Sequence, residues 1–339
     1  MISTFPTKES LYQMISGARK ILITTHVGPD GDAIGSSLGL ALFIKKLNPE
    51  VRVAVPNDYP DFLHWMPGNE LVMNYMRQKG EVDTYLRETD LIFYLDYNEN
   101  SRGGQLEPVL SSSGACKILI DHHLTPAMDT EYCLSDSKAS STAELVYSFI
   151  REMLGAEHLM DADIATCIYA GILTDTGCFS FNSSRGETFR QVAALLDYGI
   201  DKDNIYSLIY DNFSVMRMLL LGHCLSTMRV FPEYKAAYMT LSLEDQKRFQ
   251  YKTGDSEGFV NYPLSIEGIY FSAFFIENEE KIKISFRSKG SFSVNQFARD
   301  HFNGGGHLNA SGGDVYKASL QSVTEKFISL LPGVKDRII

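Results

Sequence analysis

The sequence predicts an α/β protein of two domains, and three observations support this. The first half of the chain repeats short, nearly continuous apolar runs between helical segments, which is typical of a parallel sheet buried on both faces. The second half changes to a strand-rich, mixed pattern, and 339 residues is long for one hydrophobic core. We therefore expect an N-terminal doubly wound, mainly parallel sheet domain, a helical connector and a smaller C-terminal α+β domain, with the active site in the interdomain cleft.

In the first half, strands and helices are expected to alternate. An amphipathic helix is expected within residues 1–20, and the expected strands are 21–25, 51–55, 91–95 and 117–120. Helical periodicity covers 36–46, 71–77 and 143–153. Because helices separate the strands, the sheet should be an open α/β sheet.

The pattern changes near residues 183–186. Helices are expected over 187–210 and 214–227, with breaks at Gly199 and at Asp211-Asn212. Candidate strands follow at 234–241, 266–276 and 281–287, and residues 276–281 are typical of a hairpin turn. These features predict a first domain over 1–186, a helical linker over 187–230 and a second domain over 231–339.

Composition excludes several classes of protein. The net charge of −11 argues against coating long nucleic acids, which requires an excess of basic residues, but it permits a short nucleotide in a local pocket. The five cysteines are odd in number and show no C-x-x-C spacing, so free thiols are expected. The N-terminus lacks the apolar core of a signal peptide, and no apolar stretch could span a membrane. A cytoplasmic protein is expected.

Acidic and histidine side chains gather at the ends of the predicted strands. The strand at 21–25 is followed by His26, Asp30 and Asp32, the strand at 91–95 by Asp96, and the strand at 117–120 by Asp121-His122-His123. A further acid, Asp175, ends the apolar segment 168–173. In open α/β sheets, ligand sites lie beyond the carboxyl ends of strands. Three of the four clusters have that position, so we expect them to converge on one crevice.

This concentration of carboxylates predicts bound cations, because like charges packed together cannot all be ionised unless cations neutralise them. Carboxylates with one or two imidazoles suit Mn²⁺, Mg²⁺ or Fe²⁺, and the absence of thiolates counts against structural zinc. The acids are too many for one ion, so two divalent ions roughly 3.5–4 Å apart are expected. A single Asp after a strand is usually a helix cap or turn residue. Four clusters at corresponding positions favour a functional site.

With these residues the sequence resembles the DHH phosphoesterase family, named for the triplet present here as Asp121-His122-His123. The segment 26–32 resembles the family's first motif, Asp96 its second and Asp175 its fourth. The segment 303–313 resembles the glycine-rich signature of the associated C-terminal domain found in one large branch. One departure is Ser311, where the family more often has Ala, but a small residue is kept.

The resemblance implies a role for each residue. One metal ion would be bound by His26, Asp30 and Asp96, and a second by Asp32, Asp96, His122 and Asp175, with Asp96 bridging. Asp121 would stand behind His122 and orient it. His123 would contact the phosphoryl oxygen or assist protonation of the leaving group. Mn²⁺ is the favoured metal, with Mg²⁺ or Fe²⁺ as alternatives.

Substrate-binding residues are expected in the second domain. Glycines let backbone N–H groups approach an anion, so Gly304, Gly305 and Gly306 are candidates to bind phosphate together with His307. The alternative is a tight turn in which the glycines only permit positive φ. Arg287 is a second candidate, because its planar guanidinium matches phosphate oxygens, and Arg102 is a weaker one. The alternative for Arg287 is an ordinary arginine on a strand surface.

The two-domain architecture most resembles the branch that degrades very short RNAs (nanoRNA) and dephosphorylates 3′-phosphoadenosine 5′-phosphate (pAp). We therefore expect a Mn²⁺-dependent phosphoesterase whose partners are short RNA or small nucleotides, not long nucleic acid or a membrane. A phosphodiesterase of cyclic or linear dinucleotides, such as cyclic di-AMP or pApA, is the alternative, and a non-catalytic nucleotide sensor is a minor one. The cleavage polarity and the formation of a homodimer are left open.

Overall fold

The computed structural model describes residues 5–124 and 126–338. The chain divides into two compact units, the first ending at Asn212 and the second beginning at Phe213. This division lies inside the range 187–230 expected as a helical linker, so the helices of that range are shared between the two units. Each unit is described by itself.

The first unit contains a parallel six-stranded sheet in the order β3-β2-β1-β4-β5-β6. Its strands are β1 (Ile21–Thr24), β2 (Val51–Val55), β3 (Val72–Asn74), β4 (Leu91–Leu95), β5 (Cys116–Asp121) and β6 (Tyr132–Ser135). The chain moves outward from β1 to β3 on one side and from β4 to β6 on the other. The strand order therefore reverses between β1 and β4, and ligands bind at the carboxyl ends of strands at such a switch point.

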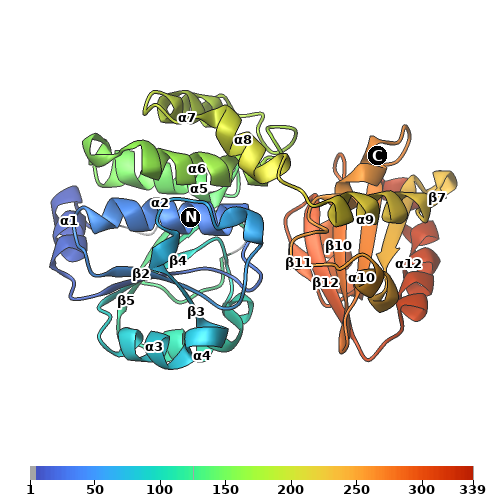
Figure 1. Ribbon diagram of the computed structural model, residues 1–339, viewed down its shortest axis with the longest axis horizontal. Coiled ribbons are helices and arrows are strands. Elements are labelled where there is room, and N and C mark those ends of the chain that lie inside the picture. The colour runs from blue at the N-terminus through green and yellow to red at the C-terminus, as the bar shows by residue number, and fades with distance from the viewer. Residues whose placement is uncertain (1–4, 125, 339) are drawn as a thin grey trace. The chain divides into compact units, whose positions relative to one another are not determined.

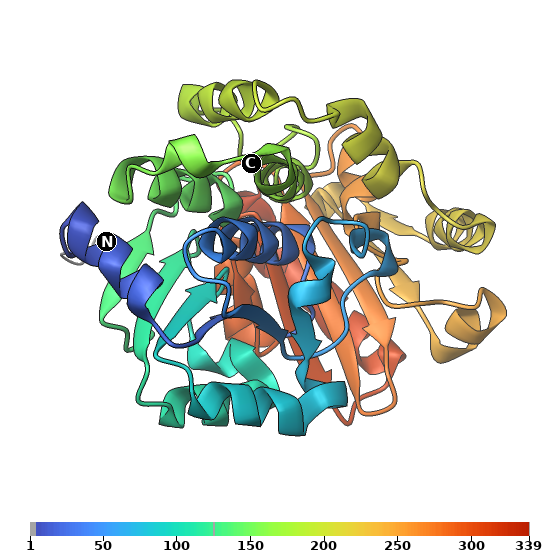
Figure 2. The same ribbon diagram turned by 60° about the vertical axis from the view of Figure 1, so that its left-hand side comes forward.

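Helices cover both faces of this sheet. They are α1 (Lys8–Gly17), α2 (Gly31–Lys45), α3 (Tyr75–Arg87), α4 (Glu107–Ser112), α5 (Thr142–Ser148), α6 (Ala162–Asp175), α7 (Gly186–Leu196) and α8 (Lys202–Tyr210). Layers containing α2, α5 and α6 lie on one face, and α3 and α4 lie on the other (Figures 1 and 2). Strand residues alternate accordingly, as Phe93 joins the core beside α2 while Ile92 joins the core beside α3. This confirms the doubly wound α/β domain.

The second unit is smaller and contains a mixed six-stranded sheet in the order β11-β12-β10-β9-β8-β7. Its strands are β7 (Arg229–Phe231), β8 (Ala236–Leu241), β9 (Phe271–Glu277), β10 (Lys281–Ser288), β11 (Gly305–Gly306) and β12 (Ala310–Tyr316). Only the β8–β9 pair is parallel among the described pairs. The helices are α9 (Val215–Ser226), α10 (Leu243–Arg248), α11 (Val294–His301) and α12 (Leu320–Val334). Phe275 packs with α11 and α12, and Phe274 packs with α9, so this sheet is also covered on both faces.

Several elements begin elsewhere than the sequence predicts. Helix α2 starts at Gly31 rather than at 36, because the Asp30 carboxylate caps it by accepting from the amides of Asp32 and Ala33. The range 71–77, expected to be helical, contains β3 and only the start of α3. Helix α1 lies within the range 1–20, of which residues 1–4 are outside the described part. Within the described ranges, no helix combines the length and apolar character needed to cross a membrane.

Candidate metal centre

The sheet brings the predicted acids together at the switch point of the first unit. Asp96 directly follows β4, Asp121 is the last residue of β5, and His26 follows the end of β1. Asp96 has a φ of 63°, in the left-handed region that residues other than glycine rarely adopt. Backbone strain of this kind concentrates at functional sites.

One group of ligand atoms comes from His26, Asp30 and Asp96, all within 4.8 Å of one another. The Nε2 of His26 lies 3.4 Å from Oδ2 of Asp96. Its Nδ1 lies 3.0 Å from the Val27 carbonyl oxygen, which can only accept a hydrogen bond. Nδ1 therefore carries the proton, and Nε2 is left to bind a cation.

A second group comes from Asp32, Asp96 and His122. The Nε2 of His122 lies 3.6 Å from Oδ1 of Asp96, 3.8 Å from Oδ2 of Asp32 and 3.4 Å from Oδ2 of Asp175. Its Nδ1 faces the carbonyl oxygen of Ala139 at 3.3 Å, which fixes the same tautomer as in His26. The two groups share Asp96, whose two carboxylate oxygens face different histidines.

The third group joins Asp121 and His123. The Nδ1 of His123 lies 2.7 Å from Oδ1 of Asp121, and the His123 amide donates to Oδ2 at 3.1 Å. The Nε2 of His123 lies 2.9 Å from Nη1 of Arg102, which can only donate. His123 is therefore neutral, in agreement with its pKa, which burial and the nearby Arg102 charge hold well below the usual value.

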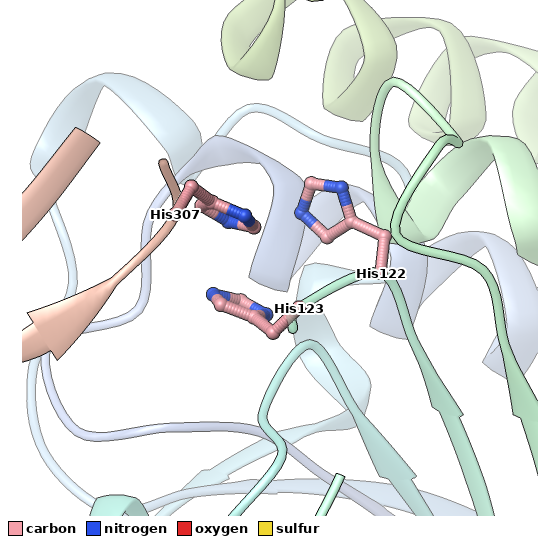
Figure 3. Close-up of side chains that lie close together, drawn as sticks. All are labelled: His122, His123 and His307. Atoms are coloured by element: carbon pink, nitrogen blue, oxygen red, sulfur yellow. The ribbon is translucent and has the colours of Figure 1, made fainter. Parts of the chain in front are cut away.

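This arrangement differs in one respect from the expected one. Asp121 was expected behind His122, but its hydrogen bonds described above go to His123, while the Ala139 carbonyl faces Nδ1 of His122. Figure 3 shows the rings of His122 and His123 projecting to the same side of the segment that follows β5, and their centroids are 5.1 Å apart. His307, also drawn there, belongs to the second unit and is treated with it.

The buried carboxylates perturb one another. Burial and the neighbouring charges of Asp96, Asp175 and Asp30 raise the pKa of Asp32 well above its usual value. Burial acts to raise the pKa of Asp96 too, but the neighbouring imidazoles, His26 foremost, lower it overall. The side chains of Asp32 and Asp96 are only 1% and 3% exposed, so solvent cannot relieve their repulsion. The oxygen-rich donor set with imidazoles fits hard divalent cations.

Helix packing brings Asp32 and Asp175 to this site. Helix α2 carries Asp32 in its first turn, and Asp175 is the last residue of α6. The two helices approach closely at Gly35, where a Cβ atom would lie 2.6 Å from the carbonyl oxygen of Cys167. The sequence pattern did not reveal this contact. It also missed Thr142, whose hydroxyl donates to Asp96; the S-x-x-E pattern at Ser141 signals the start of a helix but not its position over the site.

The glycine-rich segment of the second unit forms a tight hairpin. Gly305 and Gly306 make up β11, and the His307 amide donates to the Ala310 carbonyl at 2.7 Å. A Cβ atom on Gly304 would lie 1.9 Å from the Gly312 carbonyl oxygen, and Gly306 has a φ of 142°. Gly304 and Gly306 are therefore required by the backbone. A Cβ atom on Gly305 would meet nothing closer than 3.6 Å, so the fold does not require that glycine.

The other predicted residues of the second unit lie on its sheet. Arg287 is on β10, opposite Ala310 on β12 and Ser272 on β9, and its Nη1 donates to the Phe286 carbonyl at 3.0 Å. Ser311, the departure from the family pattern, donates its hydroxyl to the Val294 carbonyl at 2.8 Å. The serine is thus accommodated in the hairpin by a hydrogen bond to the start of α11.

Comparison with known proteins identifies both domains of the chain. Residues 20–172 match the model of the DHH family, N-terminal domain, and residues 233–332 match the DHHA1 domain. The chain is 33% identical to the bifunctional oligoribonuclease and PAP phosphatase NrnA of Thermus thermophilus, covering 91% of this chain and 88% of that protein. It is 28% identical to the protein of the same name in Bacillus subtilis, covering 91% and 93%.

The solved structures include a relative with higher sequence identity. The crystal structure of an exopolyphosphatase-related protein from Bacteroides fragilis is 42% identical, covers 98% of this chain and 97% of its own, and gives a TM-score of 0.92. The sequence matches extend over both units, and the residues of the candidate metal centre lie within or next to the matched first domain. The chain belongs to the DHH family, with a DHHA1 domain as its second unit.

Proposed function

We propose that this chain is a metal-dependent phosphoesterase that hydrolyses short oligoribonucleotides and removes a phosphate from pAp. The observation that carries the proposal is the shared position of Asp96 between two groups of Asp and His ligand atoms. The names of the two NrnA relatives supply the substrates, and these relatives match over nearly their whole length. The activity follows from the metal groups, and the substrate class rests on the relatives.

We assign one divalent cation to each of the two groups, with Mn²⁺ as the preferred metal. The first is assigned to His26, Asp30 and Asp96, and the second to Asp32, Asp96, His122 and Asp175. Bound cations of this kind lower the pKa of water and stabilise charge on a phosphoryl group. The two histidines favour this assignment because the Nδ1 atom of each faces a carbonyl oxygen, which leaves Nε2 directed at the carboxylates.

His123 and Arg102 are proposed to contact the reacting phosphate. Asp121 and Arg102 hold the His123 ring from both nitrogens. A neutral His123 held in this way is not a ready proton donor, because Nε2 already accepts from Arg102. We therefore favour phosphate positioning over leaving-group protonation, with the remaining N–H groups of Arg102 as the donors to phosphate oxygens.

The second unit is proposed to bind the nucleotide through the hairpin and its neighbours. Gly305 is the residue whose missing side chain the fold does not explain, so close approach of a phosphate to its backbone is the proposed reason. Gly304, Gly306, His307 and Arg287 are proposed to complete this surface. The acidic net charge of −11 is consistent with a small substrate held by a few local donors.

A substrate panel tests the proposal. Purified protein with Mn²⁺, and in parallel with Mg²⁺, is incubated with a labelled RNA dinucleotide, an RNA trinucleotide, pAp, pApA and cyclic di-AMP. We expect mononucleotides from the short RNAs and AMP from pAp. Faster turnover of cyclic di-AMP would favour the dinucleotide phosphodiesterase instead. Binding without turnover of any of these substrates would indicate a nucleotide sensor and would refute the proposed enzymatic activity. End-labelled trinucleotides report the cleavage polarity.

A further inference from the structure

The start of α5 hydrogen-bonds to two carboxylates of the candidate metal centre. The main-chain amide of Thr142 donates to Oδ2 of Asp32 at 2.6 Å, and the amide of Ala143 donates to Oδ1 of the same residue at 2.9 Å. The hydroxyl of Thr142 donates to Oδ1 of Asp96 at 2.9 Å. One residue outside the assigned ligand set therefore contacts both acids.

These contacts lie in the interior of the first unit. Thr142 is 0% exposed, and Asp32 and Asp96 are 1% and 2% exposed. Hydrogen bonds to charged groups are stronger than neutral ones, and a buried acceptor that loses its donor has no water to replace it. Asp32 and Asp96 belong to segments that are 110 and 46 residues from Thr142 in sequence, so Thr142 fixes one acid relative to the other.

The segment that carries Thr142 is itself held rigidly. Ser141 caps α5 by accepting from the Glu144 amide at 3.0 Å. The buried Glu144 carboxylate in turn accepts from the amide and hydroxyl of Ser140 and from the hydroxyl of Thr188 on α7. Just before it, the Ala139 carbonyl faces Nδ1 of His122. The segment 139–143 thus contacts three of the assigned ligands from a fixed backbone.

We infer that Thr142 is a positioning residue of the metal centre, which sets the orientation of the Asp96 carboxylate. Its hydroxyl holds Oδ1, the oxygen that faces His122, and so directs Oδ2 towards His26. The two oxygens of Asp96 face different groups of ligand atoms, and without this hydrogen bond the carboxylate could rotate between orientations. The inference rests on the proposed metal binding and adds a residue that acts on the metals only through Asp96 and Asp32.

Substitution of Thr142 tests this inference with metal binding as the readout. Thr142→Val keeps the shape and removes the hydroxyl, Thr142→Ala removes it with less steric risk, and Thr142→Ser keeps it. Mn²⁺ affinity is measured by calorimetry on metal-free protein, together with the rise in melting temperature on adding Mn²⁺. We expect Mn²⁺ binding to weaken roughly 10- to 100-fold in the Val and Ala variants, as for other partners of metal ligands, and to recover in the Ser variant.

Thr89→Val is the matched control. Thr89 is also buried in the first unit, and its hydroxyl donates only to the Tyr85 carbonyl among the contacts described, so its loss should leave Mn²⁺ affinity unchanged. A wild-type protein that binds Mn²⁺ and folded Val and Ala variants that bind it equally well would overturn the role of Thr142 alone. A wild-type protein that binds no divalent metal would overturn the proposed metal centre as well.

Discussion

The two units of this chain build their candidate sites in opposite ways. In the first unit, side chains that follow β1, β4 and β5, together with others at the start of α2 and the end of α6, supply ligand atoms that meet at a switch point of the sheet. In the second unit, the candidate segment is a hairpin whose distinguishing feature is missing side chains. A cluster of buried acids does not stabilise a fold, whereas glycines are often required by the backbone. The acidic cluster of the first unit is therefore stronger evidence of function than the glycine-rich segment of the second.

Replacement of Asp96 is expected to give the largest effect. Asp96→Asn keeps the shape of the side chain but removes the charge shared by both ligand groups. Mutation of a residue that only hydrogen-bonds to a metal ligand typically costs up to roughly 100-fold, so turnover should fall by more than that here. The measurement is the rate of mononucleotide release from an RNA dinucleotide at saturating Mn²⁺. A variant with unchanged turnover would contradict the assignment of both groups.

The Gly304→Ala variant tests the structural side of the comparison. The added Cβ atom would overlap the Gly312 carbonyl oxygen, so the free energy of unfolding of the second unit should fall by about 3 kcal/mol or more. Urea denaturation monitored by far-UV circular dichroism, a signal that does not depend on tryptophan, measures the change. An Ala variant as stable as the wild type would show that the hairpin is not as tightly packed as described.

Substitution of Arg102 is expected to have an intermediate effect. Arg102→Lys keeps the positive charge but loses the planar donor group that reaches Nε2 of His123, so kcat should fall roughly tenfold to a hundredfold. Steady-state kinetics with pAp separates kcat from KM. Arg151→Lys, at a surface site of the same unit, is the control and should behave as wild type. Equal kinetics for both variants would remove Arg102 from the site.

Gly305→Ala is expected to change stability least and is the matched partner of Gly304→Ala. Because the added Cβ atom meets no close neighbour, the free energy of unfolding should stay within about 0.5 kcal/mol of wild type. If a phosphate approaches this backbone, KM for short substrates should rise while stability is kept. An unchanged KM would leave the glycine without a role in substrate binding and would weaken the functional reading of the whole hairpin.

The fold of the first unit could be predicted largely because its strands are buried on both faces. Strand β4 is a continuous apolar run and β2 is a run interrupted only by Arg52, and both have the predicted limits. The position of Asp96 follows from the end of β4. Strand β3 was missed because Val72–Asn74 is a three-residue, half-buried segment at the sheet edge with no such run. Short edge strands owe their form to pairing with a neighbour, which local sequence does not record.

The candidate site could be predicted as a set of residue types but not as a geometry. Strand ends brought His26, Asp96 and His122 into one prediction, since the topology of a parallel sheet determines where they lie. Three contacts of the site could not be predicted, because each joins segments distant in sequence. They are Arg102 with His123, the Ala139 carbonyl with His122, and the Thr142 hydroxyl with Asp96. In the hairpin, only the backbone geometry separates Gly305 from its two neighbours.

Metal stoichiometry tests the central claim most directly. Metal-free wild-type protein and the Asp96→Asn variant are titrated with Mn²⁺ by calorimetry, and the metal content of each is then measured after desalting. The two ligand groups that share Asp96 predict two Mn²⁺ ions per wild-type chain and a loss of high-affinity binding at both sites in the variant. A wild-type chain that binds a single ion, or a variant that still binds two with unchanged affinity, would contradict the shared-carboxylate centre.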